Sequence, residues 1–186
     1  MTFRRMRDAT RVEWEEIERL EAELYDPADG ALALLDSLRE APLAGHPVNG
    51  YDHSLQAATR ALRAGEPDDM VVACLLHDAA VGIAPSNHGQ VAAEMLRPYV
   101  SDEVYWVVKH HGIVQKLSMG NHPYWGSGAA EEHVGPLRSH PFFERTKQFC
   151  DDYDGASFDP EYETLPIEAF EPQIRAVFSR EAFRPA

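Results

Sequence analysis

The chain has 186 residues, of which 44% are hydrophobic and 26% are charged, and its formal net charge is −14. This length fits one domain that can bury a core without disulfide bonds, and the composition is that of a globular protein. The acidic charge, with no stripe of Lys and Arg to offset it, excludes nucleic acids and anionic membrane surfaces as expected partners. A small-molecule ligand fits this charge better, especially one held by a metal.

The apolar segments favour a cytoplasmic protein. The longest apolar run, MVVACLL at residues 70–76, is too short to span a bilayer, and residues 1–24 contain no apolar stretch typical of a signal peptide. Cys74 and Cys150 stand among apolar or aromatic neighbours and outside any CxxC motif. We therefore expect both thiols to be buried and reduced.

Hydrophobic residues recur at three- and four-residue spacing along most of the chain, which predicts amphipathic helices. The expected helices are, in chain order, residues 11–25, 30–41, 51–65, 66–80, 88–100, 101–112, 136–156 and 166–180. Asp52 and Gly65 are expected to bound the third helix, and Ser101 and Gly112 the sixth. Residues 41–50 form a connection rich in Pro and Gly, and residues 116–135 are expected to be irregular. Strand patterns are scarce, so the sequence predicts a single all-α domain.

Histidines gather where these helices begin or end. The positions are His53, His77 with Asp78, His88, and His110 with His111. Each one alone is more often a cap or a surface residue, but ligands that project inward from facing helices are how helix bundles build metal sites. Neighbouring helical residues point about 100° apart, so only one of His110 and His111 can face the centre. Three further histidines lie in loop-like sequence and are expected at the surface or at the substrate edge: His122, His133 and His140.

The order of these residues resembles the H…HD…D signature of the HD-domain superfamily, in which two more histidines are inserted when the site holds two metals. His77 follows His53 after 24 residues, and a late aspartate comes from FCDDYDG. The segments HSLQAA, LLHD, HGQVAAEML and VVKHHG resemble the small HD-domain di-iron oxygenases, the group of myo-inositol oxygenase and the phosphonate-cleaving HD oxygenases. The resemblance covers roughly residues 49–160, the expected metal-binding core. Residues 1–45 would be an N-terminal helical extension, and residues 161–186 a C-terminal helix and tail.

The resemblance implies a compact helical bundle with a dinuclear metal site at its centre, in the family an Fe(II)/Fe(III) pair, with Mn, Ni, Co or Zn as alternatives. The ligands implied for one metal are His53, His77, Asp78 and Asp154, and for the other His88 and His110, with Asp78 bridging the two. The late aspartate of the relatives follows an aromatic residue, which favours Asp154 over Asp151 and Asp152. His111 stays an alternative to His110, and Asp151 to Asp154.

The implied activity is oxidative cleavage of a small hydroxylated substrate by dioxygen, with no separate catalytic side chain assigned. The main alternative is a metal-dependent phosphohydrolase acting on a phosphoester or nucleotide, the commonest activity of the wider superfamily. A third hypothesis is a non-enzymatic domain that binds metal for structure or sensing, which predicts closed coordination and no pocket. The glycine-rich segment 117–135 is either a lid or binding loop, which favours an enzyme, or a surface excursion.

Three positions depart from the phosphonate-cleaving relatives, which have a histidine, a lysine and an arginine where this chain has Val81, Val114 and Asp151. We therefore expect a neutral, zwitterionic or cationic substrate. The candidates for substrate contact are the polar residues beside the implied ligands: Gln56, Asn87, His111, Gln115 and Lys116. Each could instead make a hydrogen bond that orients a ligand histidine, and this second role is the one we favour for Gln56.

Overall fold

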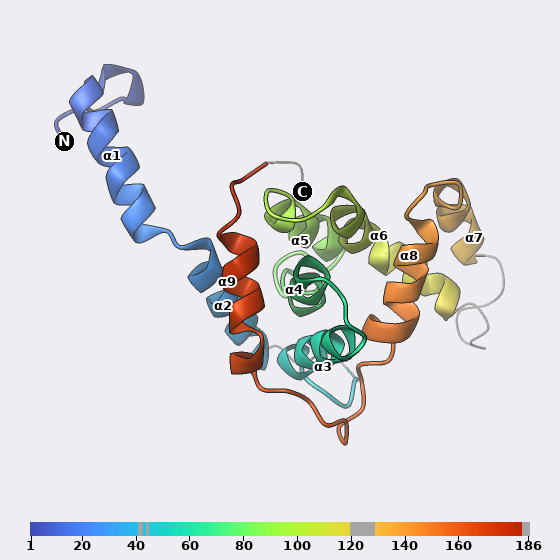
Figure 1. Cartoon of the computed structure of the whole chain (residues 1–186). Coiled ribbons are helices and arrows are strands. Elements are labelled where there is room, and N and C mark those ends of the chain that lie inside the picture. Colours follow the sequence, from blue (N-terminus) through green and yellow to red (C-terminus); the bar gives the residue numbers. More distant parts are fainter. Residues whose placement is uncertain (41–42, 44, 120–128, 184–186) are drawn as a thin grey trace.

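The computed structural model describes residues 1–40, 43, 45–119 and 129–183. Every regular element within these residues is a helix, which confirms the predicted fold class (Figure 1). The α-helices are α1 (Arg11–Leu24), α2 (Pro27–Ser37), α3 (Gly50–Arg63), α4 (Asp68–Leu76), α5 (His88–Leu96), α6 (Asp102–Ser118), α7 (Ala129–Val134), α8 (Phe143–Gln148) and α9 (Glu171–Phe178). Shorter helical turns cover Met6–Asp8, Leu38–Glu40, Gly135–Leu137, Phe149–Asp154 and Ile167–Ala169.

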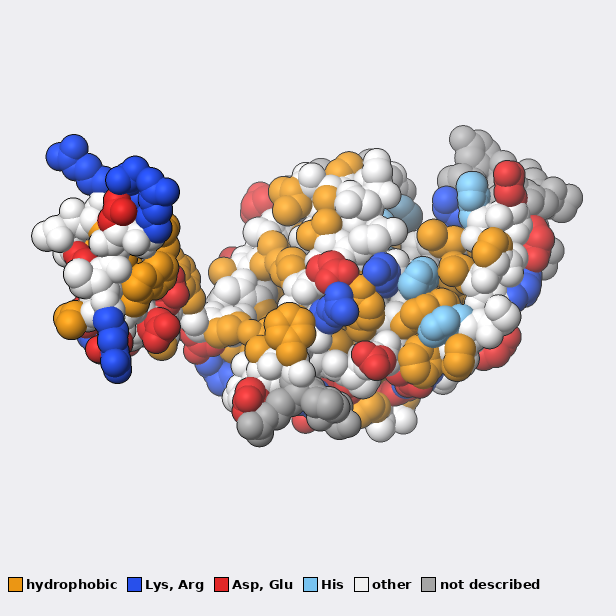
Figure 2. Space-filling view, turned by 90° about the horizontal axis from the view of Figure 1, so that it is seen from above, with side chains coloured by type: hydrophobic (Ala, Val, Ile, Leu, Met, Phe, Trp, Pro, Cys, Tyr) orange, Lys and Arg blue, Asp and Glu red, His pale blue; other side chains and the backbone are white. Residues whose placement is uncertain are grey.

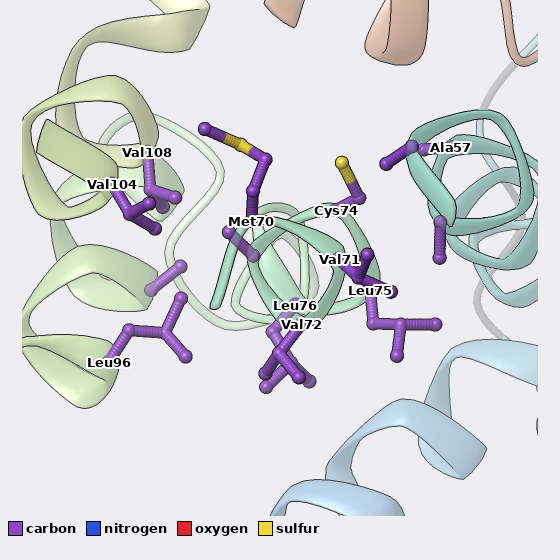
Figure 3. Packing of buried hydrophobic residues seen from close by; sticks show 14 of the residues in the cluster. Ala57, Met70, Val71, Val72, Cys74, Leu75, Leu76, Leu96, Val104 and Val108 are labelled. Carbon is purple, nitrogen blue, oxygen red and sulfur yellow. The ribbon is translucent and has the colours of Figure 1, made fainter. Parts of the chain in front are cut away.

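Helix α4 lies at the centre of the fold. Its sequence, DDMVVACLL, has no polar face after the first turn, and the residues from Met70 to Leu75 are all 0% exposed. A helix that is apolar all round needs neighbours on every side. Figure 3 shows its side chains pointing outward in several directions, with Ala57 of α3 on one side and Leu96, Val104 and Val108 of α5 and α6 on the other.

Two helix pairs form around this centre, α3 packing against α4 and α5 against α6. The chain turns from α3 to α4 at Gly65, whose φ of +78° is readily adopted only by glycine, as the sequence predicted. Helix α5 approaches α6 closely at Gly89. A Cβ atom at this position would lie 3.0 Å from the His111 ring and 3.0 Å from the Val108 carbonyl oxygen. The missing side chain therefore allows the start of α5 to lie beside His111.

Of the four residues expected to bound helices, Asp52 and Gly112 do not. Asn49, and not Asp52, caps α3: its side-chain oxygen accepts a hydrogen bond from the Asp52 backbone N–H at 2.8 Å. Ser101 caps α6 as predicted. Gly112 does not end α6, because Val114 is 0% exposed and keeps the next turn of the helix in the core.

The segment after α6 is less irregular than predicted at both of its ends. Residues 116–118 continue α6, and Ala129–Val134 form α7. Residues 120–128, and with them about half of the predicted lid or binding loop, lie outside the described residues. The helix predicted for 136–156 begins only at Phe143, the first residue of α8.

Helix α8 leads directly into a π-helical turn, Phe149–Asp154. The Gly155 backbone N–H donates to the Cys150 carbonyl oxygen, five residues earlier, at 2.8 Å. A Cβ atom on residue 155 would lie 2.7 Å from that oxygen, so the turn requires glycine at its end. Asp154 is only 2% exposed, and π-helical turns of this kind are frequent at functional sites.

The two cysteines are free and buried, which confirms the expectation from the sequence. Burial raises the pKa of both thiols and makes them poor nucleophiles. Among the described residues, no helix combines the length and the apolar character needed to cross a membrane.

Candidate metal centre

Six histidine and aspartate side chains meet inside the helical bundle. They are His53 in α3, His77 and Asp78 directly after α4, His88 at the start of α5, His111 in α6 and Asp154 at the end of the π-helical turn. Five of the six were predicted as ligands, and the sixth, His111, was the alternative to His110. The structure therefore brings together residues that are up to 101 positions apart in the chain.

Three of these residues form what we call the buried half of the cluster: His53, His77 and Asp154. The Nε2 atoms of His53 and His77 lie 3.2 Å apart. The Asp154 Oδ1 atom lies 3.4 Å from the first of these nitrogens and 3.7 Å from the second. None of the three side chains is more than 2% exposed.

The open half consists of His88 and His111, and Asp78 joins it to the buried half. The Oδ1 atom of Asp78 lies 3.1 Å from His88 Nε2 and 3.3 Å from His111 Nε2. Its Oδ2 atom faces the other way, at 3.7 Å from His53 Nε2 and 3.6 Å from His77 Nε2. One carboxylate thus presents one oxygen to each half, which is the arrangement of a bridging ligand.

All four histidines are held in the same way, by a hydrogen bond from Nδ1 to a backbone carbonyl oxygen. The pairs are His53 with Ser157 at 3.0 Å, His77 with Cys74 at 3.0 Å, His88 with Pro85 at 3.1 Å and His111 with Val108 at 2.7 Å. A carbonyl oxygen can only accept, so Nδ1 carries the proton in each ring. In the neutral rings, the Nε2 atoms therefore present lone pairs to the centre of the cluster.

These lone pairs are suited to a cation. The Nε2 atoms of His88 and His111 lie 3.3 Å apart, about as close as the pair in the buried half. Two neutral acceptors at such a distance repel each other, whereas a cation bound by both stabilises the arrangement. Imidazole nitrogens and carboxylate oxygens are donors that iron, manganese, cobalt, nickel and zinc accept. The residues present therefore fit the dinuclear site that the resemblance implied.

Protons compete with metal ions for the same atoms. Burial lowers the pKa of His77, but the Asp78 and Asp154 carboxylates outweigh this effect and raise it to about 9. Burial acts to raise the pKa of Asp154, yet hydrogen bonds with His53 and His77 hold it well below its ordinary value. Binding of a metal between these groups would release the proton that His77 carries near neutral pH.

His110 lies outside the cluster, which corrects the prediction that it is a ligand. Its ring packs against Trp106 with a centroid distance of 4.1 Å, and its Nδ1 donates to the Trp106 carbonyl oxygen at 2.9 Å. His111 is instead in phase with the buried face of α6, because it follows the buried Val104 and Val108 by seven and three residues, whereas position 110 follows them by six and two. That spacing was present in the sequence and would have selected position 111.

Asp151, the alternative to Asp154, also lies outside the cluster. Lys147 pairs with its carboxylate one helical turn away, at 2.5 Å, and the Asp151 side chain is 33% exposed. Asp154 shares the buried face of the chain with Phe149 and Tyr153. The geometry therefore agrees with the choice of Asp154.

Two of the candidates for substrate contact make hydrogen bonds that support the cluster, which is the role favoured for Gln56 from the sequence. Gln115 Nε2 donates to Asp154 Oδ2 at 2.9 Å. Gln56 holds the backbone of Asp159 on both sides: its Nε2 donates to the carbonyl oxygen at 2.8 Å, and its Oε1 accepts from the N–H at 3.2 Å. Since the carbonyl oxygen of Ser157 accepts from His53, Gln56 orients this histidine through the loop that it fixes.

Sequence reasoning missed the residues that cover the buried half. The Phe158 ring stacks on His53 at a centroid distance of 4.5 Å, and His46 stacks on Phe158 at 4.7 Å. Phe149 contacts the His77 ring edge-on at 5.4 Å. These residues belong to no motif around the ligands, and Phe158 is more than 100 positions from His53 in the chain.

The cluster is accessible from the side of His88. The side chains of Asp78 and His88 are 17% and 23% exposed. A pocket of about 300 Å³ lies beside His88, and its walls include Asn87, Lys109 and Lys116. The lining residues that the structure describes include these two lysines and no carboxylate. Asn87 and Lys116, two of the candidates for substrate contact, both line this pocket.

Comparison with known proteins agrees with the arrangement of these residues. A family model described as HD domain matches residues 50–139. The matched segment contains the cluster residues from His53 to His111 and ends before Asp154. No curated protein matches the chain. The HD domain and the buried cluster of His and Asp together fit a metal-dependent enzyme.

Proposed function

The chain carries an HD domain and belongs to the HD-domain superfamily, and from this premise we propose that it is a di-iron oxygenase. The substrate would be a small hydroxylated molecule that is cleaved oxidatively with dioxygen. The observation that carries the proposal is the position of Asp78, whose two carboxylate oxygens face two separate pairs of histidines. A site built in this way has ligands for two ions, and four imidazoles with two carboxylates suit iron.

In the proposed enzyme, some residues of the site would bind the metals, and others would leave access for the substrate. His53, His77 and Asp154 would hold one ion, His88 and His111 the other, and Asp78 would bridge them. When bound, the pair supplies a Lewis-acid and redox centre for a hydroxyl group and dioxygen. The open half offers few protein donors, which leaves room for ligands that come from solution.

The aromatic rings that cover the buried half would keep water away from it, and the pocket beside His88 would receive the substrate. Lys109 and Lys116 on the pocket wall favour a neutral or zwitterionic substrate whose electron-rich end lies near them. A cationic group, which the overall charge alone had allowed, would have to point away from these lysines. Asn87 offers a further polar group at the same entrance.

The same two lysines keep the phosphohydrolase as a second candidate. A phosphoester in this pocket would have cations beside its charged oxygens, and the chemistry supplied by the metals would then be Lewis-acid activation alone. Dinuclear HD sites are compatible with both reactions, since the ligand set is shared. The two candidates differ in whether dioxygen is consumed.

The experiment that tests the proposal measures metal content and EPR spectra of the aerobically purified chain, before and after mild reduction with ascorbate. Two irons per chain, with a mixed-valent signal that a hydroxylated compound perturbs, and oxygen uptake with that compound, would support the oxygenase. Phosphate release from a panel of phosphoesters without oxygen uptake would overturn it in favour of the phosphohydrolase. Absence of bound metal after anaerobic iron loading would refute the metal site itself.

A further inference from the structure

The π-helical turn Phe149–Asp154 sets the direction in which Asp154 points. Such turns are rare in proteins, and this one is one residue wider than an α-helical turn, since its closing hydrogen bond joins the Gly155 N–H to the Cys150 carbonyl oxygen. If the turn tightened into an α-helix, the side chains at its end would rotate around the helix axis by up to about 100°. Asp154 would then point away from the cluster. The position of this ligand therefore depends on contacts that keep the turn wide.

One carboxylate contacts the chain at both ends of this turn. Glu66 lies in the connection between α3 and α4, and its Oε1 atom accepts a hydrogen bond from the Tyr153 hydroxyl. The Arg145 guanidinium, in α8, donates to both oxygens of the same carboxylate, to Oε1 at 2.9 Å. Arg145 precedes the turn, and Tyr153 lies near its end. Glu66 therefore ties the two ends of the turn together and joins them to the corner between α3 and α4.

The contact between Glu66 and Arg145 is withdrawn from the surface. Figure 2 shows acidic and basic side chains beside one another in solvent on the face over α5 and α6, and exposed contacts of that kind contribute little to stability. The side chains of Glu66 and Arg145 are only 10% and 21% exposed. A bidentate contact between arginine and a carboxylate is also directional. This pair is therefore suited to hold the Tyr153 hydroxyl at a fixed position.

A second hydrogen bond links Tyr153 to another ligand of the buried half. The Ser157 hydroxyl donates to the Tyr153 carbonyl oxygen, and the Ser157 carbonyl oxygen accepts from His53 Nδ1 at 3.0 Å. Tyr153 is thus the neighbour of Asp154 in the chain and is connected to His53 through Ser157. A change in the position of Tyr153 would reach both of these ligands.

We propose that Glu66 is a positioning residue for the metal centre. Through Arg145 and Tyr153 it holds the π-helical turn wide, and the turn then directs Asp154 into the buried half. Glu66 itself contacts neither metal nor substrate in this role. The proposal rests on the metal centre of the proposed function, but it applies equally to an oxygenase and to a phosphohydrolase.

Tyr153→Phe tests the proposal, since it removes the hydroxyl that donates to Glu66 and keeps the ring that packs against Phe149. The readout is the affinity for Co²⁺, followed by the visible absorption of the bound ion in two parent chains. His88→Gln is the parent that keeps the ligands of the buried half, and His53→Gln is the parent that keeps those of the open half. We expect Tyr153→Phe to bind Co²⁺ about 10-fold more weakly in the first parent, at the lower end of the effect of groups that orient ligands, and equally well in the second.

Tyr105→Phe is the matched control. The Tyr105 hydroxyl also donates to a carboxylate, that of Glu94 at 2.6 Å, and this carboxylate also pairs with an arginine, Arg97. This contact is exposed, so the control should bind Co²⁺ as its parent does in both cases. A second variant, Glu66→Gln, keeps the shape of the side chain and removes its charge. It should weaken Co²⁺ binding in the same parent as Tyr153→Phe does.

The two parents separate positioning from a general loss of structure. An unchanged Co²⁺ affinity of both variants in the His88→Gln parent would overturn the proposal, because the turn would then hold Asp154 without Glu66. An equal loss of affinity in both parents would also overturn it, since the substitutions would then weaken the whole bundle. Failure of both parents to bind Co²⁺ would refute the metal centre itself, and this proposal with it.

Discussion

His110 and His111 are neighbours in α6 with opposite surroundings, and they therefore form a matched pair for testing the metal centre. We consider His111→Gln and His110→Gln, since glutamine fills much of the space of an imidazole and limits the cavity that alanine would leave. His111 Nε2 lies 3.3 Å from Asp78 Oδ1 and 3.3 Å from His88 Nε2. His110 makes no contact of this kind and packs against Trp106.

The expected effect on metal affinity follows from the number of donors. The Nε2 atom of His111 is one of three protein atoms that would bind the ion of the open half, together with His88 Nε2 and Asp78 Oδ1. Loss of a group that merely orients a ligand costs roughly 10- to 100-fold in metal affinity. Loss of a ligand itself should exceed this range, so His111→Gln should weaken the second ion by more than about 100-fold, or about 2.7 kcal/mol.

Metal titration of the anaerobic chain, followed by elemental analysis after desalting, measures this effect. We expect His111→Gln to retain about one ion where the wild type retains two, and His110→Gln to behave like the wild type. Melting of the metal-free variants checks that both fold. Equal metal loss in the two variants, or greater loss in His110→Gln, would refute the assignment of His111 to the cluster.

Three further predictions concern two residues that support the ligands and one ligand, His77. Gln56→Met removes two hydrogen bonds to the Asp159 backbone, each worth about 1 kcal/mol of stability. It should therefore lower the melting temperature by about 4–8 °C. An unchanged melting curve would contradict the role of Gln56. Gln115→Leu removes the amide group that donates to Asp154. In a competition titration, this variant should bind metal about 10- to 100-fold more weakly. An unchanged affinity would show that this contact is dispensable. The pKa of His77 is raised from 6.5 to about 9, so its stabilising contribution is complete below pH 6.5 and is lost as the pH rises through 9. Urea unfolding of the metal-free chain should accordingly give a free energy of unfolding that falls over this range, and a free energy that rises there would show that His77 is not protonated in the folded chain.

The helices could be predicted because the spacing of apolar residues in the sequence shows which side of each helix is buried. The run MVVACLL is apolar on every side, so its position at the centre of the bundle required no knowledge of its neighbours. Gly65 ended α3 for an equally local reason, its positive φ. Gly112 was misread, because a glycine in a helix reads as a stop unless the burial of the next turn, at Val114, is taken into account.

The residue types that form the site could be predicted from the sequence. The direction in which each side chain points was harder to predict. HD and HH pairs show that ligands are near, but only the phase of the helix selects between neighbours. For Asp154, burial of Phe149 and Tyr153 on the same face agrees with the choice made by resemblance. For His111 the buried valines of α6 would have corrected the prediction. The contact between Phe158 and His53 depends on how a distant loop packs, which no local pattern in the sequence encodes.

The two halves of the cluster differ in solvent exposure, and we therefore expect them to release their ions at different rates. His53 and His77 are 0% exposed and covered by aromatic rings, whereas His88 is 23% exposed beside the pocket. Loss of the ion from the buried half is opposed because the aromatic rings keep water away from the groups that would hold it. In the open half, water can replace the ion's ligands one at a time. A chelator should therefore remove one ion rapidly and the second only on the timescale of opening or unfolding of the bundle, and release of both ions at a single rate would contradict this division.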